Sequence, residues 1–268
     1  MELQLLIHLC YMKKICTIIF VFLANWAMAC SCATPTLLEN IYRSDFIAVA
    51  KILKITQDPV NKEYHDIEVK LLDVYKGDRT TKMKISSLQG SSCAFFTPVG
   101  TTWLIFASLN DDKLLTFHYC DGSEQIDREF DLKTYPGLDQ KHKNSIKLKL
   151  DVLKFFRNKK LTPADKTRLR ISLPGECLKN LKGFAGDHKD FTIYEYVVNE
   201  DLSVTDVKPV RDFKNKKLAK EFVACIENKL KNNDTTKKSI PKKIKQYLVY
   251  YFYPFEKGNE SFIGALDL

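Results

Sequence analysis

Glycine and proline are scarce in this chain, with 10 glycines and 9 prolines among 268 residues. Disordered and low-complexity chains are usually rich in both residues and poor in aromatic side chains. Here Phe and Tyr number 17 and 12. The composition therefore excludes a collagen-like or disordered chain and predicts packed globular domains.

Long apolar runs are also missing. Beyond the first thirty residues, no stretch approaches the roughly 18 consecutive apolar residues that a membrane-spanning helix needs. We therefore expect no transmembrane span once a leader has been removed.

The usual catalytic motifs are absent as well. No H-E-x-x-H, P-loop, G-x-S-x-G or G-x-G-x-x-G pattern occurs. The histidines are His8, His65, His118, His142 and His188. His118 stands two residues before Cys120, but we expect Cys120 to be oxidised. The sequence predicts a protein that is not an enzyme and that holds no cofactor or metal of its own.

The formal net charge is +9. This excess comes mostly from lysines spread along the chain, and no nucleic-acid recognition motif accompanies it. We interpret the lysines as solvated faces and expect no nucleic-acid partner.

Residues 1–29 are typical of a secretory signal peptide. From Met12 the chain reads "MKKICTIIFVFLANWAMA", in which two lysines precede an apolar run and the small-x-small pattern of Ala27-Met28-Ala29. Met1 and Met12 are both candidate starts. Cleavage after Ala29 frees the amino group of Cys30, whereas lipoprotein processing would make the same cut and acylate that group.

Cysteine usage agrees with export. Cys10 and Cys16 leave with the leader, and an even six remain: Cys30, Cys32, Cys93, Cys120, Cys177 and Cys225. In an oxidising compartment six cysteines should form disulfides, although fifteen pairings are possible. The C-x-C spacing does not match a zinc ribbon.

The first half of the mature chain has a β-rich pattern. Strands are expected at 45–55, 65–77, 82–88, 101–109 and 113–120. A short helix follows Thr34-Pro35, with Thr34 as its expected cap. A basic amphipathic helix is expected over 144–160. Five strands with flanking helices in about 100 residues predict a small closed barrel.

The second half predicts a different unit. Strands are expected at Thr192–Val198 and Val204–Arg211, followed by a helix over 214–232 and an aromatic strand over 243–255. This order makes a small α+β (ββαβ) domain. The expected organisation is a signal peptide (1–29), a barrel domain (30–135), a helical connector (136–175) and an α+β domain (176–268).

Four motifs in the first half carry a family resemblance. "CSC" at the mature terminus, "VYKG", "SSCAFFTPVGTTWLIFA" and "HYC" occur in an order that resembles the netrin-like (NTR) domain, and in particular the tissue inhibitors of metalloproteinases. The resemblance covers about residues 30–135. It implies an OB-type five-stranded barrel and the disulfides Cys30–Cys93 and Cys32–Cys120.

The same resemblance implies a mechanism. The α-amino nitrogen and carbonyl oxygen of Cys30 would chelate the catalytic zinc of a protease, at the coordination position that such a zinc keeps open. Ser31 would enter the specificity pocket, and Ser91 and Ser92 would form the neighbouring edge. The amine binds only when neutral, with an ordinary pKa of about 7.7 to 8.0, so inhibition should weaken as pH falls.

A second resemblance covers about residues 190–256. "VVNEDLSVTDVKPVR", with Leu202 at its turn, precedes a helix with Leu218 and Glu221, and this order resembles the C-terminal domain of TonB. That resemblance implies a bacterial envelope protein whose edge strand binds a partner by strand addition. Cys177 and Cys225 remain as the third cysteine pair.

Two functions therefore stay open. The first is an exported protein-binding protein, secreted, periplasmic or outer-membrane-associated, that inhibits zinc metalloproteases through Cys30. The second is a disulfide-stapled interaction module, or a lipoprotein anchored at Cys30, without inhibitory activity.

Overall fold

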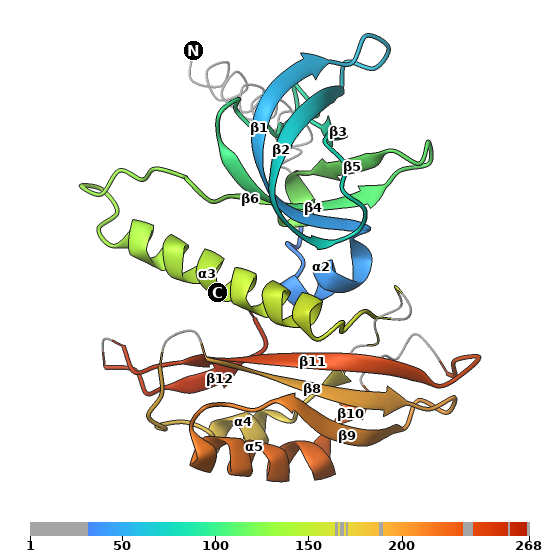
Figure 1. The fold of residues 1–268 in the computed structure, drawn as a ribbon. Coiled ribbons are helices and arrows are strands. Elements are labelled where there is room, and N and C mark those ends of the chain that lie inside the picture. The colour runs from blue at the N-terminus through green and yellow to red at the C-terminus, as the bar shows by residue number, and fades with distance from the viewer. Residues whose placement is uncertain are drawn as a thin grey trace, which may run out of the picture.

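The computed structural model describes residues 32–163, 166, 169, 171–187, 190–232, 238–256 and 258–266. The predicted signal peptide, Cys30 and Ser31 lie outside these residues. A barrel and a second sheet form two layers, and helix α3 (Leu138–Asn158) runs between them (Figure 1). The expected fold class, a five-stranded barrel followed by an α+β unit, is confirmed.

Five strands close the barrel: β1 (Phe46–Gln57), β2 (Tyr64–Lys76), β3 (Lys82–Ser86), β4 (Thr102–Leu109) and β5 (Leu115–His118). The order β1-β2-β3-β5-β4 returns to β1, which pairs with both β2 and β4. The pairing of β3 with β5 is parallel. A short sixth strand, β6 (Glu124–Gln125), pairs with β4 outside the barrel.

Apolar side chains at every second position of the strands fill the barrel interior. Phe46, Ala48, Ala50 and Ile52 of β1 point into it, and the side chains of successive strand residues lie on opposite faces. The residues between them, such as Ile47 and Val49, belong to a second core outside the barrel. The first half of β1 is therefore buried on both faces, which explains its unbroken apolar sequence.

Helix α2 (Leu37–Arg43) packs beside the barrel, and its cap lies two residues later than predicted. Thr36 is the N-cap, not Thr34: its hydroxyl accepts a hydrogen bond from the amide of Glu39, and the Glu39 carboxylate accepts one from the amide of Thr36. This capping box satisfies two amide groups that lack a partner inside the helix.

Helix α3 starts at Leu138, six residues before the predicted start at 144. Gly137 precedes it with φ 78°, a left-handed conformation that glycine adopts at little cost. Leu148, Val152, Leu153 and Phe156 are buried in the core between the layers. The segment predicted as a connector thus contributes a helix to the middle layer of the molecule.

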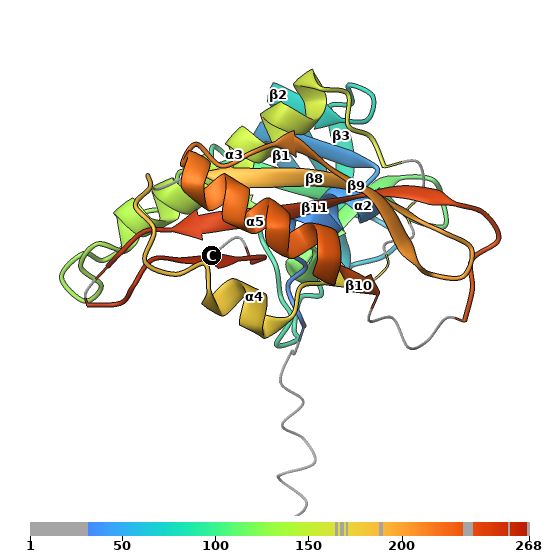
Figure 2. The same ribbon diagram turned by 90° about the horizontal axis from the view of Figure 1, so that it is seen from below.

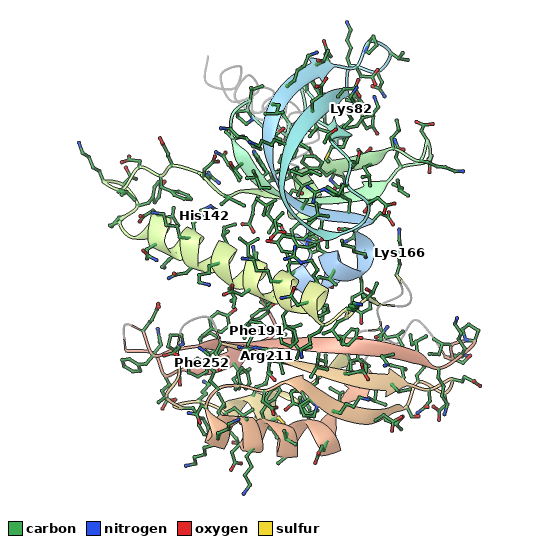
Figure 3. All side chains as sticks on the ribbon, viewed as in Figure 1. Lys82, His142, Lys166, Phe191, Arg211 and Phe252 are labelled. Carbon is green, nitrogen blue, oxygen red and sulfur yellow. A yellow bond between two sulfur atoms is a disulfide. The ribbon has the colours of Figure 1, made fainter. Side chains whose placement is uncertain are left out.

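The second sheet has the order β12-β11-β8-β9. Its strands are β8 (Phe191–Val198), β9 (Val204–Arg211), β11 (Ile244–Tyr253) and β12 (Phe262–Gly264). Phe191, Ile193 and Tyr247 face α3 and the barrel. Figure 3 labels Phe191 beneath α3, next to Arg211, whose guanidinium lies 3.7 Å from the centre of the Phe191 ring.

Helix α5 (Lys216–Lys229) covers the opposite face of this sheet (Figure 2). Leu218, Phe222 and Ile226 pack against Tyr194 and Tyr250. A short helix, α4 (Gly175–Lys179), lies beside it, and two short strands, β7 (Ile171–Ser172) and β10 (Lys231–Asn232), pair with each other. The sequence analysis did not predict β6, β7, β10, β12 or α4.

A disulfide joins α4 to α5. Cys177 and Cys225 are bonded, with Cα atoms 5.9 Å apart. This is the pair that remained once the NTR resemblance had implied the other two disulfides.

Candidate functional site: the disulfide-bearing end of the barrel

The described chain begins at a disulfide. Cys32 is bonded to Cys120, with Cα atoms 5.6 Å apart and 88 positions between them in the sequence. Cys120 lies in a single helical turn, Tyr119–Asp121, directly after β5. The first described residue is thereby fixed to the end of the barrel's fifth strand.

Cys93 is disulfide-bonded too. Its expected partner, Cys30, lies outside the described residues, as does Ser31. Cys93 sits in the loop between β3 and β4, so the loops that follow β3 and β5 both carry cystines at this end of the barrel.

Ser91 and Ser92 precede Cys93 on an exposed turn. The Ser91 hydroxyl donates to the carbonyl of Leu88 at 2.8 Å and accepts from the amide of Cys93 at 3.1 Å. Gly90 (φ 87°) and Leu88 (φ 43°) give the turn its left-handed backbone. Ser91 therefore shapes the loop that presents Ser92 and Cys93.

A buried histidine holds the base of that loop. His65 of β2 is 8% exposed, and its Nδ1 lies 2.7 Å from the hydroxyl of Ser87. Its Nε2 lies 3.1 Å from the amide nitrogen of Gln89. An amide NH₂ only donates, so Nε2 is the acceptor, Nδ1–H donates to Ser87, and the Ser87 hydroxyl donates to the carbonyl of Glu63. This chain of bonds ties the loop to β2.

No sequence motif marks His65 as a functional residue. Its signal was its position, because His65, Ile67 and Val69 alternate on the inward face of one strand and are all buried. A polar residue at such a position must find hydrogen-bond partners.

His118 and Asp121 stabilise the turn after β5 that carries Cys120. The His118 Nδ1 accepts from the amide of Cys120 at 3.1 Å, which places the ring proton on Nε2, and Nε2 lies 3.2 Å from the Asp121 carboxylate. Burial raises the pKa of Asp121, and the neighbouring His118 acts in the opposite direction. The pair caps the turn that carries Cys120, so we assign it a positioning role and no catalytic one.

Exposed aromatic residues flank the disulfides. Phe96 and Tyr119 are each 52% exposed. Beneath them, buried Phe95 makes edge contacts with Tyr119, Phe117 and Trp103. We call Ser91, Ser92, Phe96 and Tyr119, with Cys32, Cys93 and Cys120, the cystine edge. Sequence reasoning predicted its cysteines and serines and missed its aromatic residues.

The edge of the second sheet is less suited to strand addition than its TonB resemblance implies. β9 is the last strand of the sheet on one side. However, Pro209 lacks an amide donor, Asp206 has φ 53°, and the pairing with β8 shifts register twice. Proline and bulges are devices that block edge pairing.

Within the described residues, no group of three or more His, Cys, Asp or Glu side chains could hold a metal ion. None of the helices described here is long and apolar enough to cross a membrane. No protein-family model matches the chain, and no curated protein matches it significantly.

Proposed function

We propose that this protein is exported and binds another protein through the cystine edge, most concretely as an inhibitor of zinc metalloproteases. One observation carries the proposal. The Cys32–Cys120 disulfide anchors the residues just after Cys30 to an exposed edge with large, accessible aromatic side chains.

Rigidity supports this function. A terminus that must chelate a partner's zinc loses less entropy on binding if it is already fixed in the free protein. Cys32 is held by its disulfide to a turn that His118 and Asp121 cap, while His65 supports the neighbouring loop. The amine and carbonyl of Cys30 would supply the two zinc ligands, with Ser31 entering the specificity pocket.

The aromatic residues support the binding of a protein partner in general. Tyr and Phe are enriched in the buried centres of interfaces, and isolated exposed aromatic residues contribute little to folding. Phe96 and Tyr119 lie on the two loops that carry Cys93 and Cys120. A partner that contacted both loops could bind both rings.

The test compares the mature chain beginning at Cys30 with a variant that has one alanine added before Cys30. Inhibition of zinc metalloproteases of the H-E-x-x-H class is measured with a peptide substrate. We expect the mature chain to inhibit, the extended chain to lose inhibition, and a chain extended at its C-terminus to match the mature form. Equal inhibition by both N-terminal forms would exclude chelation by the amine.

A second comparison addresses the edge itself. Phe96→Ala and Tyr119→Ala should each weaken binding to the inhibited protease by roughly tenfold or more. Phe255→Ala is the matched control, since Phe255 is also exposed but lies in the second domain. If only the control weakened binding, the partner would bind elsewhere.

The alternative is a disulfide-stapled module or a lipoprotein anchored at Cys30. The module predicts that neither N-terminal form inhibits any metalloprotease. The lipoprotein predicts an acylated amine, which cannot chelate zinc. The proline, the left-handed residue and the register shifts of β9 make strand addition at β9 the weaker route to a partner.

A further inference from the structure

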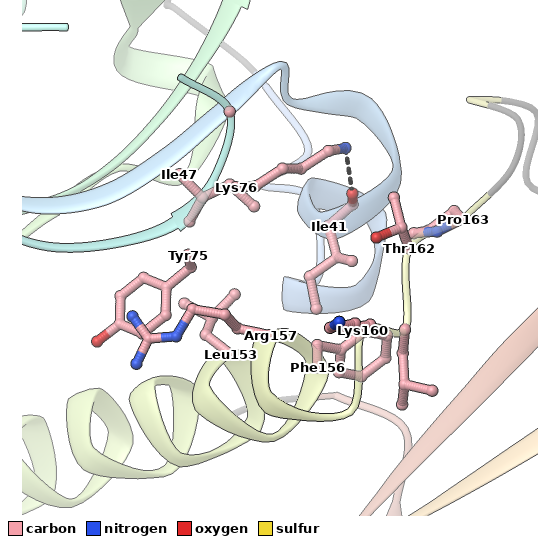
Figure 4. A pocket seen from close by; sticks show the side chains of 12 residues that line it. Ile41, Ile47, Tyr75, Lys76, Leu153, Phe156, Arg157, Lys160, Thr162 and Pro163 are labelled. Atoms are coloured by element: carbon pink, nitrogen blue, oxygen red, sulfur yellow. Dashed lines mark hydrogen bonds between the residues drawn. The ribbon is translucent and has the colours of Figure 1, made fainter. Parts of the chain in front are cut away.

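A cavity of about 300 Å³ lies where α2, the end of β2 and the C-terminal end of α3 meet (Figure 4). None of its lining residues belongs to the cystine edge, and the proposed function makes no use of it. Ile41, Ile47, Leu153 and Phe156 form its apolar walls, and all four are almost completely buried. Leu161, half-buried, lines it from the segment after α3.

Cations line the same cavity. Lys76, Arg157 and Lys160 are among its described lining residues, which include no carboxylate. An apolar cavity that carries only positive charge at its rim is complementary to an amphipathic anion. The question is which of the three cations a ligand can reach.

Arg157 is already occupied. Its guanidinium pairs with Asp73, donates to the carbonyl of Val74 at 2.8 Å and covers the ring of Tyr75. Figure 4 shows this guanidinium over Tyr75, on the side of the cavity away from Thr162. We interpret Arg157 as part of the wall.

Lys76 and Lys160 each have N–H donors that can still bind an anion. The Lys76 ammonium donates to the carbonyl of Ile41 at 2.7 Å and approaches that of Tyr42 at 3.5 Å, which leaves at least one N–H unused. Burial lowers the pKa of Lys76 and the nearby Asp45 raises it in part, so a further anion beside Lys76 would favour its charged form. Lys160 is exposed, follows α3 with φ 53°, and makes no ion pair with any described residue.

The volume sets the size of the ligand. A dry cavity of about 150 Å³ holds benzene, which has six heavy atoms. Twice that volume suits about ten to twelve heavy atoms. We propose that this cavity binds a medium-chain fatty acid of about eight carbons, with its chain against Ile41, Ile47 and Phe156 and its carboxylate toward Lys160 and Lys76.

The test uses octanoate as the probe and the full mature chain. Calorimetry should give saturable one-to-one binding, and methyl NMR should show shifts at Ile41 and Ile47. 1-Octanol, of similar size but uncharged, should bind at least roughly tenfold more weakly, because a charge-assisted hydrogen bond is lost. Absence of saturable binding, or equal affinity for the alcohol, would overturn the proposal.

Three variants locate the site. Leu161→Trp, which fills the cavity, should abolish binding, and Lys160→Gln should weaken it by roughly fivefold, as expected for a partly exposed ion pair. Lys159→Gln is the matched control, because the neighbouring Lys159 is also exposed but does not line the cavity. The circular dichroism of Leu161→Trp checks its folding. Unchanged affinity in Lys160→Gln, or an equal loss in Lys159→Gln, would show that octanoate binds elsewhere.

Discussion

Gly77 occupies a position that no other residue fits well. It ends the "VYKG" stretch after β2 with φ +84°, and a Cβ there would lie 2.5 Å from the carbonyl oxygen of Asp45. Gly77→Ala should therefore cost about 2 kcal/mol or more in the free energy of unfolding, from backbone strain plus the clash.

Gly100→Ala is the control for that measurement. Gly100 has nearly the same φ, +89°, but nothing lies within 4 Å of an added Cβ. It should cost about 1 kcal/mol, the strain alone. Equal losses for the two variants in urea unfolding would show that the contact with Asp45 is unimportant.

The contacts of the Asp58 carboxylate should make the stability of the fold depend on pH. Lys84 pairs with its carboxylate and the amides of Asn61 and Val60 donate to it, which lowers its pKa from 3.8 to about 2. Because the folded pKa is below the unfolded one, the contribution to stability is complete above pH 3.8 and is lost as pH falls toward 2.

Carboxyl NMR titration measures this pKa directly. Lys84→Met should raise the pKa of Asp58, whereas Lys54→Met, which removes an exposed pair with Glu68, should leave it unchanged. A pKa of Asp58 near 3.8 in the unmodified protein would contradict the assigned contacts.

At the scale of elements, the Cys32–Cys120 disulfide is expected to be a large local contribution to stability. It closes a loop of 88 positions, for which loop entropy predicts about 4 to 5 kcal/mol. The double variant Cys32→Ser with Cys120→Ser should lose most of this stability in urea unfolding and, under the proposed function, lose inhibition as well.

The other disulfide supplies the control. Removing Cys177–Cys225 by the same substitutions should also destabilise the protein but leave inhibition intact, since α4 and α5 lie at the far face of the second sheet. Loss of inhibition in both variants would mean that stability alone governs the assay.

Element positions followed from the sequence where alternation was strong. In β2, for example, the apolar residues Ile67 and Val69 alternate with exposed polar residues, and this alternation predicts a half-buried strand. The early start of α3 was missed because "LDQKHKN" contains a single apolar side chain, Leu138, and therefore carries no periodic apolar signal. Leu202, at the predicted turn between β8 and β9, has φ 67°, so this turn holds a left-handed residue. The cavity beside α3 joins four separate segments, which no local pattern could reveal.

At the scale of the whole molecule, one core links the two layers. Residues of α2, β1, α3, β8 and β11 share it. The hydroxyl of Tyr42 accepts a hydrogen bond from the amide of Tyr247 at 2.9 Å, across 205 positions of sequence. The periodicity of each element predicted an apolar face but not which element covers it.

The shared core predicts cooperative unfolding. Trp103, in the barrel, is the single tryptophan after the predicted cleavage site, so its fluorescence reports on the barrel while far-UV circular dichroism reports on both layers. The two transitions should coincide. Tyr42→Phe leaves a buried amide without its acceptor, so it should lower the free energy of unfolding reported by both probes by about 1 to 3 kcal/mol. Tyr64→Phe, at a half-buried site in β2, is the control and should change this free energy little. Separate transitions would mean that the layers fold independently.

The account depends most on the chemical state of Cys30, because the cystine edge can present a zinc-binding amine only if that amine is free. Intact-mass analysis of the protein isolated from its native host tests this directly. We predict the mass of residues 30–268 with three disulfides and no further modification. A mass several hundred daltons higher, as acylation of Cys30 would produce, would contradict the proposed function.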